Sequence, residues 1–347
     1  MKTKELAGGD LRLSALCLGA MNFGGRMAAQ DAHRQIDTAL AHGVNCIDTA
    51  EMYPVNPISP ETVGHSEGVI GDWIAQSGRR GEMVLATKIS GANGGWIRDG
   101  RGFDGVEIRA AVDASLSRLQ TDYIDIYQLH WPNRGSYHFR QNWDYDASTQ
   151  DRAETDAHMR DVLAAMADVV AAGKVRHFGL SNETAWGTAR WIRLAHEMGA
   201  PAPVTIQNEY SLLCRSFDTD LAELCAHEDM ALLAFSPLAT GLLSGKYAHG
   251  AVPEGSRMAS QPELGGRNTA PAHDAVAAYQ KIADRHGLNL TQMALAFCIS
   301  RPFMGTTIFG ASDAAQLDLA LAAADLELSD DVISEINAAH KVHPMPY

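Results

Sequence analysis

The chain has 347 residues, of which 46% are hydrophobic, and it carries a formal net charge of -14. That length is sufficient for one large α/β core without a second domain. The negative charge disfavours nucleic acid and anionic membrane surfaces as partners, and no stretch approaches the roughly 20 apolar residues that a membrane span requires.

Cysteine usage and the N-terminus favour a cytoplasmic protein. The five cysteines form neither a CxxC pair nor a zinc-ligand spacing, and Cys17, Cys46 and Cys298 lie in apolar runs where reduced, buried thiols are expected. The N-terminal residues lack a long apolar segment and a cleavage signature. We therefore expect a reducing, cytoplasmic environment.

A β-hairpin is predicted at the start of the chain, in KTKELAGGDLRLS, with a Gly-Gly-Asp turn. After it, short apolar runs rich in β-branched and aromatic residues alternate with segments of helical periodicity. The predicted strands are Leu16–Met21, Val44–Thr49, Met83–Lys88, Tyr123–His130, Val175–Ser181, Val204–Asn208, Ala231–Ser236 and Thr306–Gly310. The predicted helices are Asp31–His42, Ser66–Ser77, Asp104–Leu119, Met159–Ala172, Trp186–Met198, Thr219–Glu228, Ala272–His286, Leu290–Ser300 and Ala314–Ala323.

Eight strand-then-helix units favour a (β/α)8 TIM barrel over an open doubly wound sheet. Residues 1–347 are expected to form this single domain. No GxGxxG motif follows the first strand, since Leu18-Gly19-Ala20 leads to Asn22-Phe23-Gly24-Gly25, and a Rossmann domain is therefore disfavoured.

Three long stretches break the alternation: Asn133–Asp156, Ala248–His273 and the tail His340–Tyr347. Long excursions at the functional end of a barrel are usually lids or substrate walls, although surface decoration is the alternative. Aromatic residues in and near these stretches are candidates for the pocket wall, namely Trp96, Trp131, Trp143 and Tyr145.

Four ionisable residues stand where predicted strands end. Asp48, Lys88 and His130 end three strands, and Tyr53 lies in the loop just beyond one of them. Active sites of barrels lie at the C-terminal ends of the strands, so these residues are expected to meet. Each residue alone has a simpler explanation: a helix cap or turn, a loop residue, a snorkelling lysine or a structural histidine.

Together the four residues can deliver a proton to a carbonyl oxygen. A free tyrosine has a pKa of about 10, and a nearby ammonium stabilises its phenolate. We expect Lys88 to lower the pKa of Tyr53, with Asp48 holding Lys88 in place. His130 would orient the substrate oxygen or share in proton transfer, and the accompanying hydride must come from a cofactor.

The chain resembles the aldo-keto reductase superfamily over nearly its whole length, and most closely its Tas-type, NADP(H)-dependent branch. The motifs that carry the resemblance are DTAEMYP, ATK, QLHWP, GLSN, TIQNEYSLL, AFSPLATGLLSGKY and FGAS. The resemblance implies a (β/α)8 barrel, a small-molecule carbonyl substrate, and a catalytic tetrad of Asp48, Tyr53, Lys88 and His130 with Tyr53 as general acid. It implies no metal ion.

The resemblance also implies where NADP(H) binds, with NAD(H) as an alternative. Ser181, Asn182 and Gln207 resemble the groups that bind the nicotinamide carboxamide, and Tyr210 resembles the aromatic residue that stacks on the ring. The pyrophosphate loop would contain Ser236, Leu238, Gly241 and Lys246, where small residues let backbone N–H groups approach phosphate oxygens. The adenosine side would contain Gly310, Ser312 and Gln316, at a helix start that suits an anion.

The chain departs from the family pattern at three positions. Glu209 replaces the proline that often precedes the tyrosine at 210, which places a carboxylate beside the nicotinamide pocket. Ala320 stands where an asparagine is common. The stretch Gly310–Gln316, in which many NADPH-selective members have a basic residue, has none here and contains the acidic Asp313.

Two other functions remain possible from the sequence. One is a nicotinamide-binding barrel that senses redox state or regulates a partner with little turnover, as potassium-channel β-subunit relatives do. The other is a metal-dependent barrel hydrolase, which would require several His and carboxylate ligands, including a pair such as His-x-His that the sequence lacks.

Overall fold

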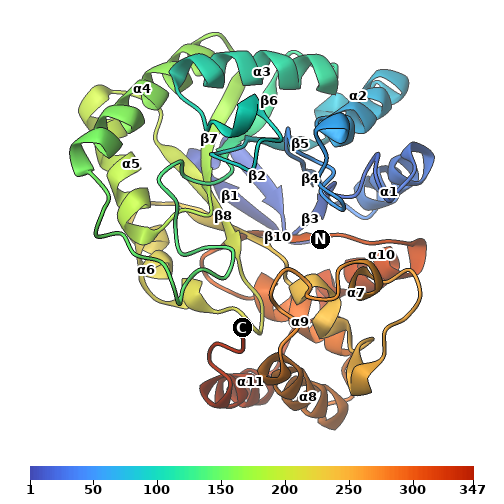
Figure 1. The fold of residues 1–347 in the computed structure, drawn as a ribbon. Coiled ribbons are helices and arrows are strands. Elements are labelled where there is room, and N and C mark those ends of the chain that lie inside the picture. The colour runs from blue at the N-terminus through green and yellow to red at the C-terminus, as the bar shows by residue number, and fades with distance from the viewer.

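Eight parallel strands close into a barrel in the computed structural model, which describes residues 1–347 (Figure 1). The strands are β3 (Leu16–Gly19), β4 (Cys46–Asp48), β5 (Val84–Ile89), β6 (Ile124–Leu129), β7 (Val175–Ser181), β8 (Pro203–Glu209), β9 (Ala231–Phe235) and β10 (Met304–Phe309). They follow one another around the ring in chain order, and β10 closes it by pairing with β3. The predicted (β/α)8 TIM barrel is confirmed, with all eight strands where the apolar runs indicated.

The predicted N-terminal hairpin is also confirmed, and it closes one end of the barrel. Strand β1 (Thr3–Leu6) pairs antiparallel with β2 (Leu11–Ser14). Figure 1 shows both strands in the middle of the ring. Their leucines form a buried cluster with residues of the barrel strands: Leu6, Leu11, Leu13, Cys17, Cys46, Ala86, Ile126, Ala231, Leu233 and Ile308. The hairpin therefore covers the N-terminal end of the barrel, and the opposite end is left for chemistry.

Helices cover the outside of the ring (Figure 1). They are α1 (Ala29–Ala41), α2 (His65–Ser77), α3 (Gly105–Leu119), α4 (Arg152–Ala171), α5 (Ala185–Met198), α6 (Asp220–His227), α7 (Arg257–Ser260), α8 (Ala270–Arg285), α9 (Leu290–Ile299), α10 (Ala314–Leu321) and α11 (Asp330–Val342). Nine of these were predicted from periodicity. Together with the outward faces of the strands they form the main core of 76 buried residues.

Helix α4 begins seven residues earlier than predicted. The Asp151 side chain accepts a hydrogen bond from the backbone N–H of Glu154, as an N-cap does. The long excursion after β6 therefore ends at Asp151, and the predicted boundary at Asp156 was wrong. The order Asp-x-x-Glu at 151–154 was a readable capping signal.

Helix α11 was not predicted, and it occupies part of the expected tail. Ser329 caps it by accepting from the backbone N–H of Val332, and Val332 and Ile336 are buried on one face. The aspartates at 330 and 331 suit the positive end of the helix dipole. The helix ends at Val342, so the irregular tail is shorter than the predicted His340–Tyr347.

The excursion after β9 is also partly helical. Ser256 caps the short helix α7, and Thr269 caps α8, which begins at Ala270. The predicted irregular stretch Ala248–His273 therefore contains one helix and the start of another.

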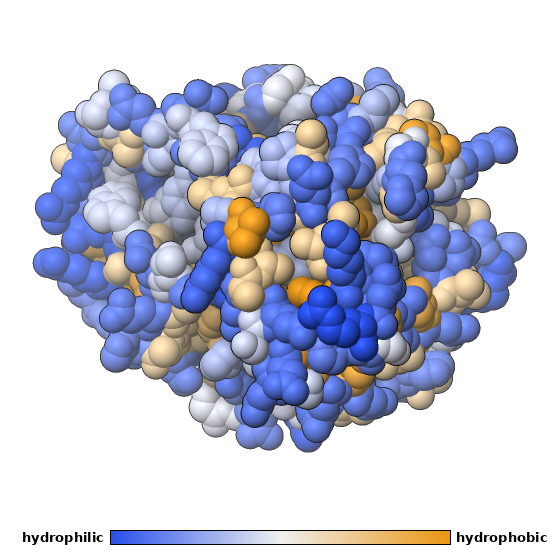
Figure 2. All heavy atoms as spheres, turned by 90° about the horizontal axis from the view of Figure 1, so that it is seen from below, coloured by the Kyte–Doolittle hydropathy of each residue, from blue (hydrophilic) through white to orange (hydrophobic).

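No helix of the structure has both the length and the apolar character needed to cross a membrane. Figure 2 views the molecule from the side where α8 and α11 lie in Figure 1; this face is mainly hydrophilic, with small, separated hydrophobic spots.

Candidate active site at the C-terminal ends of the strands

The four ionisable residues predicted to meet do so at the C-terminal end of the barrel. Asp48 is the last residue of β4, Lys88 is the penultimate residue of β5, and His130 directly follows β6. Because β4, β5 and β6 are neighbours in the ring, their ends bring these side chains to one place. Tyr53 reaches the same place from the loop after β4, with its ring beside both Lys88 and His130.

Lys88 forms a buried ion pair with Asp48. Its ammonium donates to Asp48 Oδ2 and to the backbone oxygen of Thr49, each at 2.6 Å, and the lysine side chain is fully buried. Burial lowers the pKa of Lys88, but the carboxylate of Asp48 and the neighbouring Tyr53 outweigh this, and the net pKa lies above its ordinary value. The amine is therefore held as a cation without access to water.

Tyr53 lies against this cation. The Lys88 Nζ atom is 5.0 Å from the centroid of the tyrosine ring, and the ring of His130 is 5.7 Å away, nearly perpendicular to it. Burial raises the pKa of Tyr53; Lys88 lowers it by its charge and by a hydrogen bond, and Asp48 raises it, so the net pKa is above its ordinary value. The expected net lowering was wrong for this reason, although Lys88 does act in the expected direction.

His130 is a neutral imidazole in this environment. Burial, and then the positive charge of Lys88, hold the pKa of His130 well below its usual range. Its Nδ1 atom is buried and has no hydrogen-bond partner in the protein. A neutral ring with unpaired nitrogens can donate a hydrogen bond to a carbonyl oxygen or accept one.

The Asp48 carboxylate gathers hydrogen bonds from three other strands. Besides Lys88 of β5, the side-chain amides of Gln128 on β6 and Gln207 on β8 donate to Asp48 Oδ1, at 3.3 and 2.8 Å. Gln128 was not singled out from the sequence. Its position two residues before His130 on a strand places both side chains on the same face, which is the signal that could have found it.

Residues at the ends of β7 and β8 form a second polar group. Ser181 Oγ donates to the backbone oxygen of Gln207 at 2.8 Å, and Asn182 Nδ2 donates to the backbone oxygen of His130 at 2.9 Å. Asn182 Oδ1 is buried and has no hydrogen-bond partner in the protein. An unsatisfied buried carbonyl oxygen beside His130 is suited to an incoming N–H donor, such as a carboxamide.

Tyr210 follows β8 and is fully buried. Its hydroxyl donates to Asp218 at 2.6 Å, and its ring packs parallel to Phe297 and perpendicular to Phe303. These contacts fix the ring in the wall behind the end of β8. The structure shows no solvent-exposed face on it.

The loop after β9 has the backbone expected of an anion cradle. Ser236, Ala239, Thr240 and Gly241 all have positive φ angles. The N–H groups of Leu238 and Thr240 donate to no backbone carbonyl. A Cβ atom at Gly241 would lie 3.0 Å from Lys246 Cε and 3.2 Å from its Nζ, so the glycine is what lets the ammonium approach this loop.

Besides the predicted Lys246, two further cations, Arg257 and Arg26, lie near this loop and were not predicted. Lys246 and Arg257 form no ion pair with a carboxylate, and burial, then the charges of Arg267 and Arg26, lower the pKa of Arg257. Arg26 donates to the backbone oxygen of Gly255 and to Ser260, on either side of Arg257. No pattern in the sequence of the excursion after β9 predicts that these arginines lie close together.

The residues predicted for the adenosine side lie together at the start of α10, and they contact one another. The backbone N–H of Ser312 donates to Gln316 Oε1 at 3.2 Å, and Gln316 Nε2 donates to Asp313 at 2.8 Å. Asp313 also caps the helix by accepting from the backbone N–H of Gln316. Gly310 directly precedes this group, after the end of β10.

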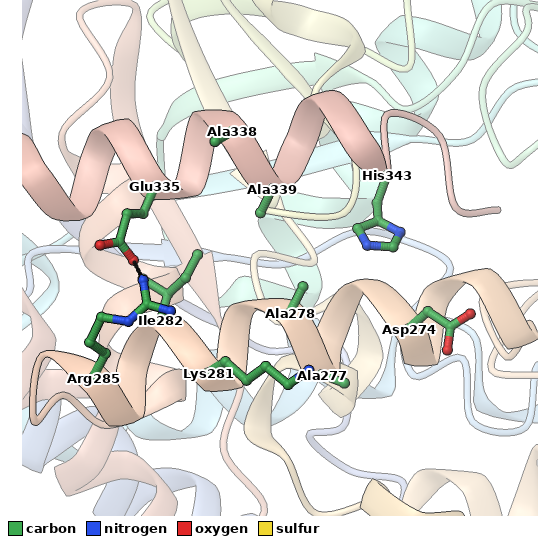
Figure 3. A pocket seen from close by; sticks show the side chains of 10 residues that line it. All are labelled: Asp274, Ala277, Ala278, Lys281, Ile282, Arg285, Glu335, Ala338, Ala339 and His343. Atoms are coloured by element: carbon green, nitrogen blue, oxygen red, sulfur yellow. Dashed lines mark hydrogen bonds and ion pairs between the residues drawn. The ribbon is translucent and has the colours of Figure 1, made fainter.

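One surface hollow lies away from these residues. A groove of about 530 Å³ runs between α8 and α11, lined along its middle by Ala277, Ala278, Ala338 and Ala339 (Figure 3). The Arg285–Glu335 ion pair closes one end of it. It contains none of the residues described above.

Comparison with known proteins agrees with this geometry. A sequence model of the aldo/keto reductase family matches residues 15–341. Protein tas of Escherichia coli is 44% identical over 100% of this chain and 99% of its own length. The uncharacterized oxidoreductase YrpG of Bacillus subtilis is 31% identical, and a probable voltage-gated potassium channel subunit beta of Arabidopsis thaliana is 30% identical, each over 94% of this chain and 92% of the relative.

Proposed function

The chain belongs to the aldo/keto reductase family and is an oxidoreductase, and from this premise we propose that it reduces aldehyde or ketone carbonyls to alcohols with NADP(H), using Tyr53 as general acid. The observation that supports this most directly is the fully buried Lys88, bound to Asp48 and lying against Tyr53 and His130. Such a group can hold one proton on Tyr53 and release it to a substrate at the C-terminal end of the barrel.

In this proposal each side chain has one task. Tyr53 holds the proton that the carbonyl oxygen receives, and Lys88 stabilises the phenolate that remains. Asp48 keeps Lys88 charged and in place. His130, being neutral, donates a hydrogen bond to the same carbonyl oxygen and so sets the orientation of the substrate.

A nicotinamide cofactor, which this family typically uses, supplies the hydride when bound. The residues fit it. Asn182 Oδ1, which has no protein partner, suits a carboxamide N–H; Ser181 and Gln207 stand beside it. Tyr210, which the resemblance assigned to stacking on the ring, is fully buried and would support the wall of the site from behind.

The anionic part of the cofactor would lie over the loop after β9. Free N–H groups at Leu238 and Thr240, with Lys246 and Arg257 nearby, give local positive potential on a chain of net charge -14. Ser236, Gly241, Gly310, Ser312 and Gln316 would line the rest of the site. The proposal includes a preference for NADP(H) over NAD(H). These unpaired cations would hold the ribose phosphate, because Asp313 at the start of α10 would repel it.

The second candidate is a nicotinamide-binding barrel that senses redox state with little turnover. The observation that favours it is the 30% identity to a probable potassium channel subunit beta. Turnover separates the two candidates.

The test measures oxidation of NADPH, and of NADH, across a panel of aldehydes and ketones with the wild type and Tyr53→Phe. We expect wild-type turnover, a loss of about 100-fold or more in kcat for Tyr53→Phe because its general acid is gone, and cofactor binding within a few fold of wild type. Cofactor binding without turnover of any carbonyl by the wild type would favour the second candidate.

A further inference from the structure

A group of two arginines, one glutamate and one tyrosine, buried at its centre, stands at the end of β8. Glu209 accepts two hydrogen bonds from Arg267, from Nε to Oε1 and from Nη2 to Oε2, each at 2.7 Å. Arg140 Nη1 donates to Oε2 at 3.1 Å, and the Tyr347 hydroxyl donates to Oε1 at 3.1 Å. The three partners come from the excursion after β6, the excursion after β9 and the tail.

The charges in this group do not cancel. Arg267 binds the carboxylate through a paired, bidentate contact, which is the strongest arrangement available to a guanidinium. Arg140 shares that carboxylate through one longer bond, so two positive charges face one negative charge. Burial and then the charge of Arg267 lower the pKa of Arg140, but a guanidinium remains charged throughout the physiological range.

Arg140 retains unused donors in a place that solutes can reach. A guanidinium has five N–H groups, and that of Arg140 makes one hydrogen bond, to Glu209. Its side chain is 19% exposed, whereas those of Arg267 and Glu209 are 6% and 8% exposed. Of the two arginines, Arg140 is thus the one that can still take an anion.

The backbone of the excursion after β6 sets the position of Arg140. Phe139 and Arg140 both have positive φ angles, and the Arg140 side chain crosses Gly266, where a Cβ would lie 3.4 Å from its Cδ and Nε. The ring of Phe139 packs edge-on against Trp131, whose own ring lies 4.7 Å from that of His130.

The topology puts the catalytic acid across the barrel mouth from this group. Strand β8, which carries Glu209, is four strands from β4 in the eight-strand ring, and Tyr53 follows β4. A substrate whose carbonyl meets Tyr53 and His130, and which is long enough to cross the mouth in this direction, would meet Arg140.

We propose that Arg140 binds an anionic group, such as a carboxylate, on the carbonyl substrate, so that the enzyme prefers negatively charged aldehydes over neutral ones of the same size. Glu209 and Arg267 act as positioning residues that hold the guanidinium at the mouth. This inference rests on the proposed reductase function and specifies its substrate class.

The experiment compares a matched pair of substrates, 4-formylbenzoate and its neutral methyl ester, at saturating NADPH. For the wild type we expect kcat/KM to be about tenfold or more higher for the acid, as a charge-assisted contact provides. In Arg140→Gln the acid-to-ester ratio should fall about tenfold, mainly through KM for the acid. Arg193→Gln, which removes an exposed charge on α5, should keep the wild-type ratio.

A wild-type ratio near one, or an unchanged ratio in Arg140→Gln, would overturn the inference and leave the proposed function standing. A weaker affinity for NADPH in Arg140→Gln with both substrates affected equally would also overturn it, because the anion recognised would then be a cofactor phosphate. Absence of turnover with both aldehydes would overturn the proposed function and this inference together.

Inhibition of the wild type gives a test that does not depend on the folding of a variant. Benzoate should compete with the methyl ester at least about tenfold more tightly than benzamide does, and added salt should weaken that difference. Equal inhibition by the two compounds would contradict a cationic site at the mouth.

Discussion

The position of one proton governs how this site behaves with pH. Because burial holds the pKa of Tyr53 above its ordinary value, the phenol keeps its proton through the neutral range. The low pKa of His130 keeps the imidazole neutral over the same range. Neither group should change its charge between about pH 7 and pH 9.

We therefore expect kcat/KM for carbonyl reduction to be flat from about pH 7 to pH 9 and to fall only above about pH 10, as Tyr53 loses its proton. Oxidation of the alcohol needs the phenolate, so the rate of oxidation should rise about tenfold per pH unit from about pH 7 to pH 9. Initial rates in both directions across this range check the prediction. A fall in the reduction rate centred near pH 7 would show that Lys88 outweighs burial.

The Lys88–Asp48 pair should also matter for stability. Asp48→Asn leaves an ammonium buried without its carboxylate, and we expect the free energy of unfolding to fall by roughly 3 kcal/mol or more. The control is Asp168→Asn, which breaks the Arg109–Asp168 pair; that pair has the same 2.6 Å separation but is well exposed, so the change should stay under about 1 kcal/mol. Urea unfolding measures both, and equal losses would show that burial does not set the cost.

At the scale of elements, the strands and most helices could be predicted because their signals are local. A run such as VLATK needs only its own residues to indicate a buried strand that ends in a polar group. The four catalytic candidates followed from the same local pattern. Caps at Asp151 and Ser329 are equally local, and they mark the starts of α4 and α11, which apolar periodicity alone does not fix.

The partners of Glu209 could not be predicted in this way. The sequence shows that a carboxylate stands at 209, but Arg140 and Arg267 lie 69 and 58 residues away in stretches without periodicity. Their contacts depend on how three loops meet above the barrel, which no local pattern encodes. The same holds for Arg257, whose neighbours come from separate loops.

The excursion after β9 gives a prediction at this scale. Residues 248–255 are largely exposed, and the segment carries cations that would face a bound phosphate. We expect saturating NADPH to protect Ala248–His273 from proteolysis, whereas adenosine, which lacks phosphate, should not. Mass spectrometry of timed digests identifies the cleavage sites. An identical cleavage pattern with and without NADPH would contradict the prediction that this segment contacts the bound cofactor.

At the scale of the whole molecule, the N-terminal hairpin and the ionisable cluster lie at opposite ends of the barrel. The hairpin β1–β2 buries its leucines against the N-terminal ends of the strands, and the ionisable cluster lies at the other end. Changes in the hairpin should therefore affect folding and leave the reacting groups where they are.

Leu13→Ala tests this separation. Leu13 is fully buried, and its truncation should lower the free energy of unfolding by about 2–5 kcal/mol, with kcat/KM within about twofold of wild type under native conditions. Lys4→Ala, on the exposed part of the hairpin, should change stability by less than about 0.5 kcal/mol. A drop in kcat/KM for Leu13→Ala in fully folded protein would show that the two ends are coupled.

The hydrogen bonds that converge on the Asp48 carboxylate make correct assembly detectable through turnover. They come from β5, β6 and β8, so they form only when those strands align as the ring closes. A slip of β8 by one residue would present Ile206 or Asn208 where Gln207 belongs and would turn its amide to the other face. We expect a barrel with such a register slip to regain its circular dichroism spectrum on refolding but not its activity. An assay of product formation would therefore detect a register error that the spectrum does not show.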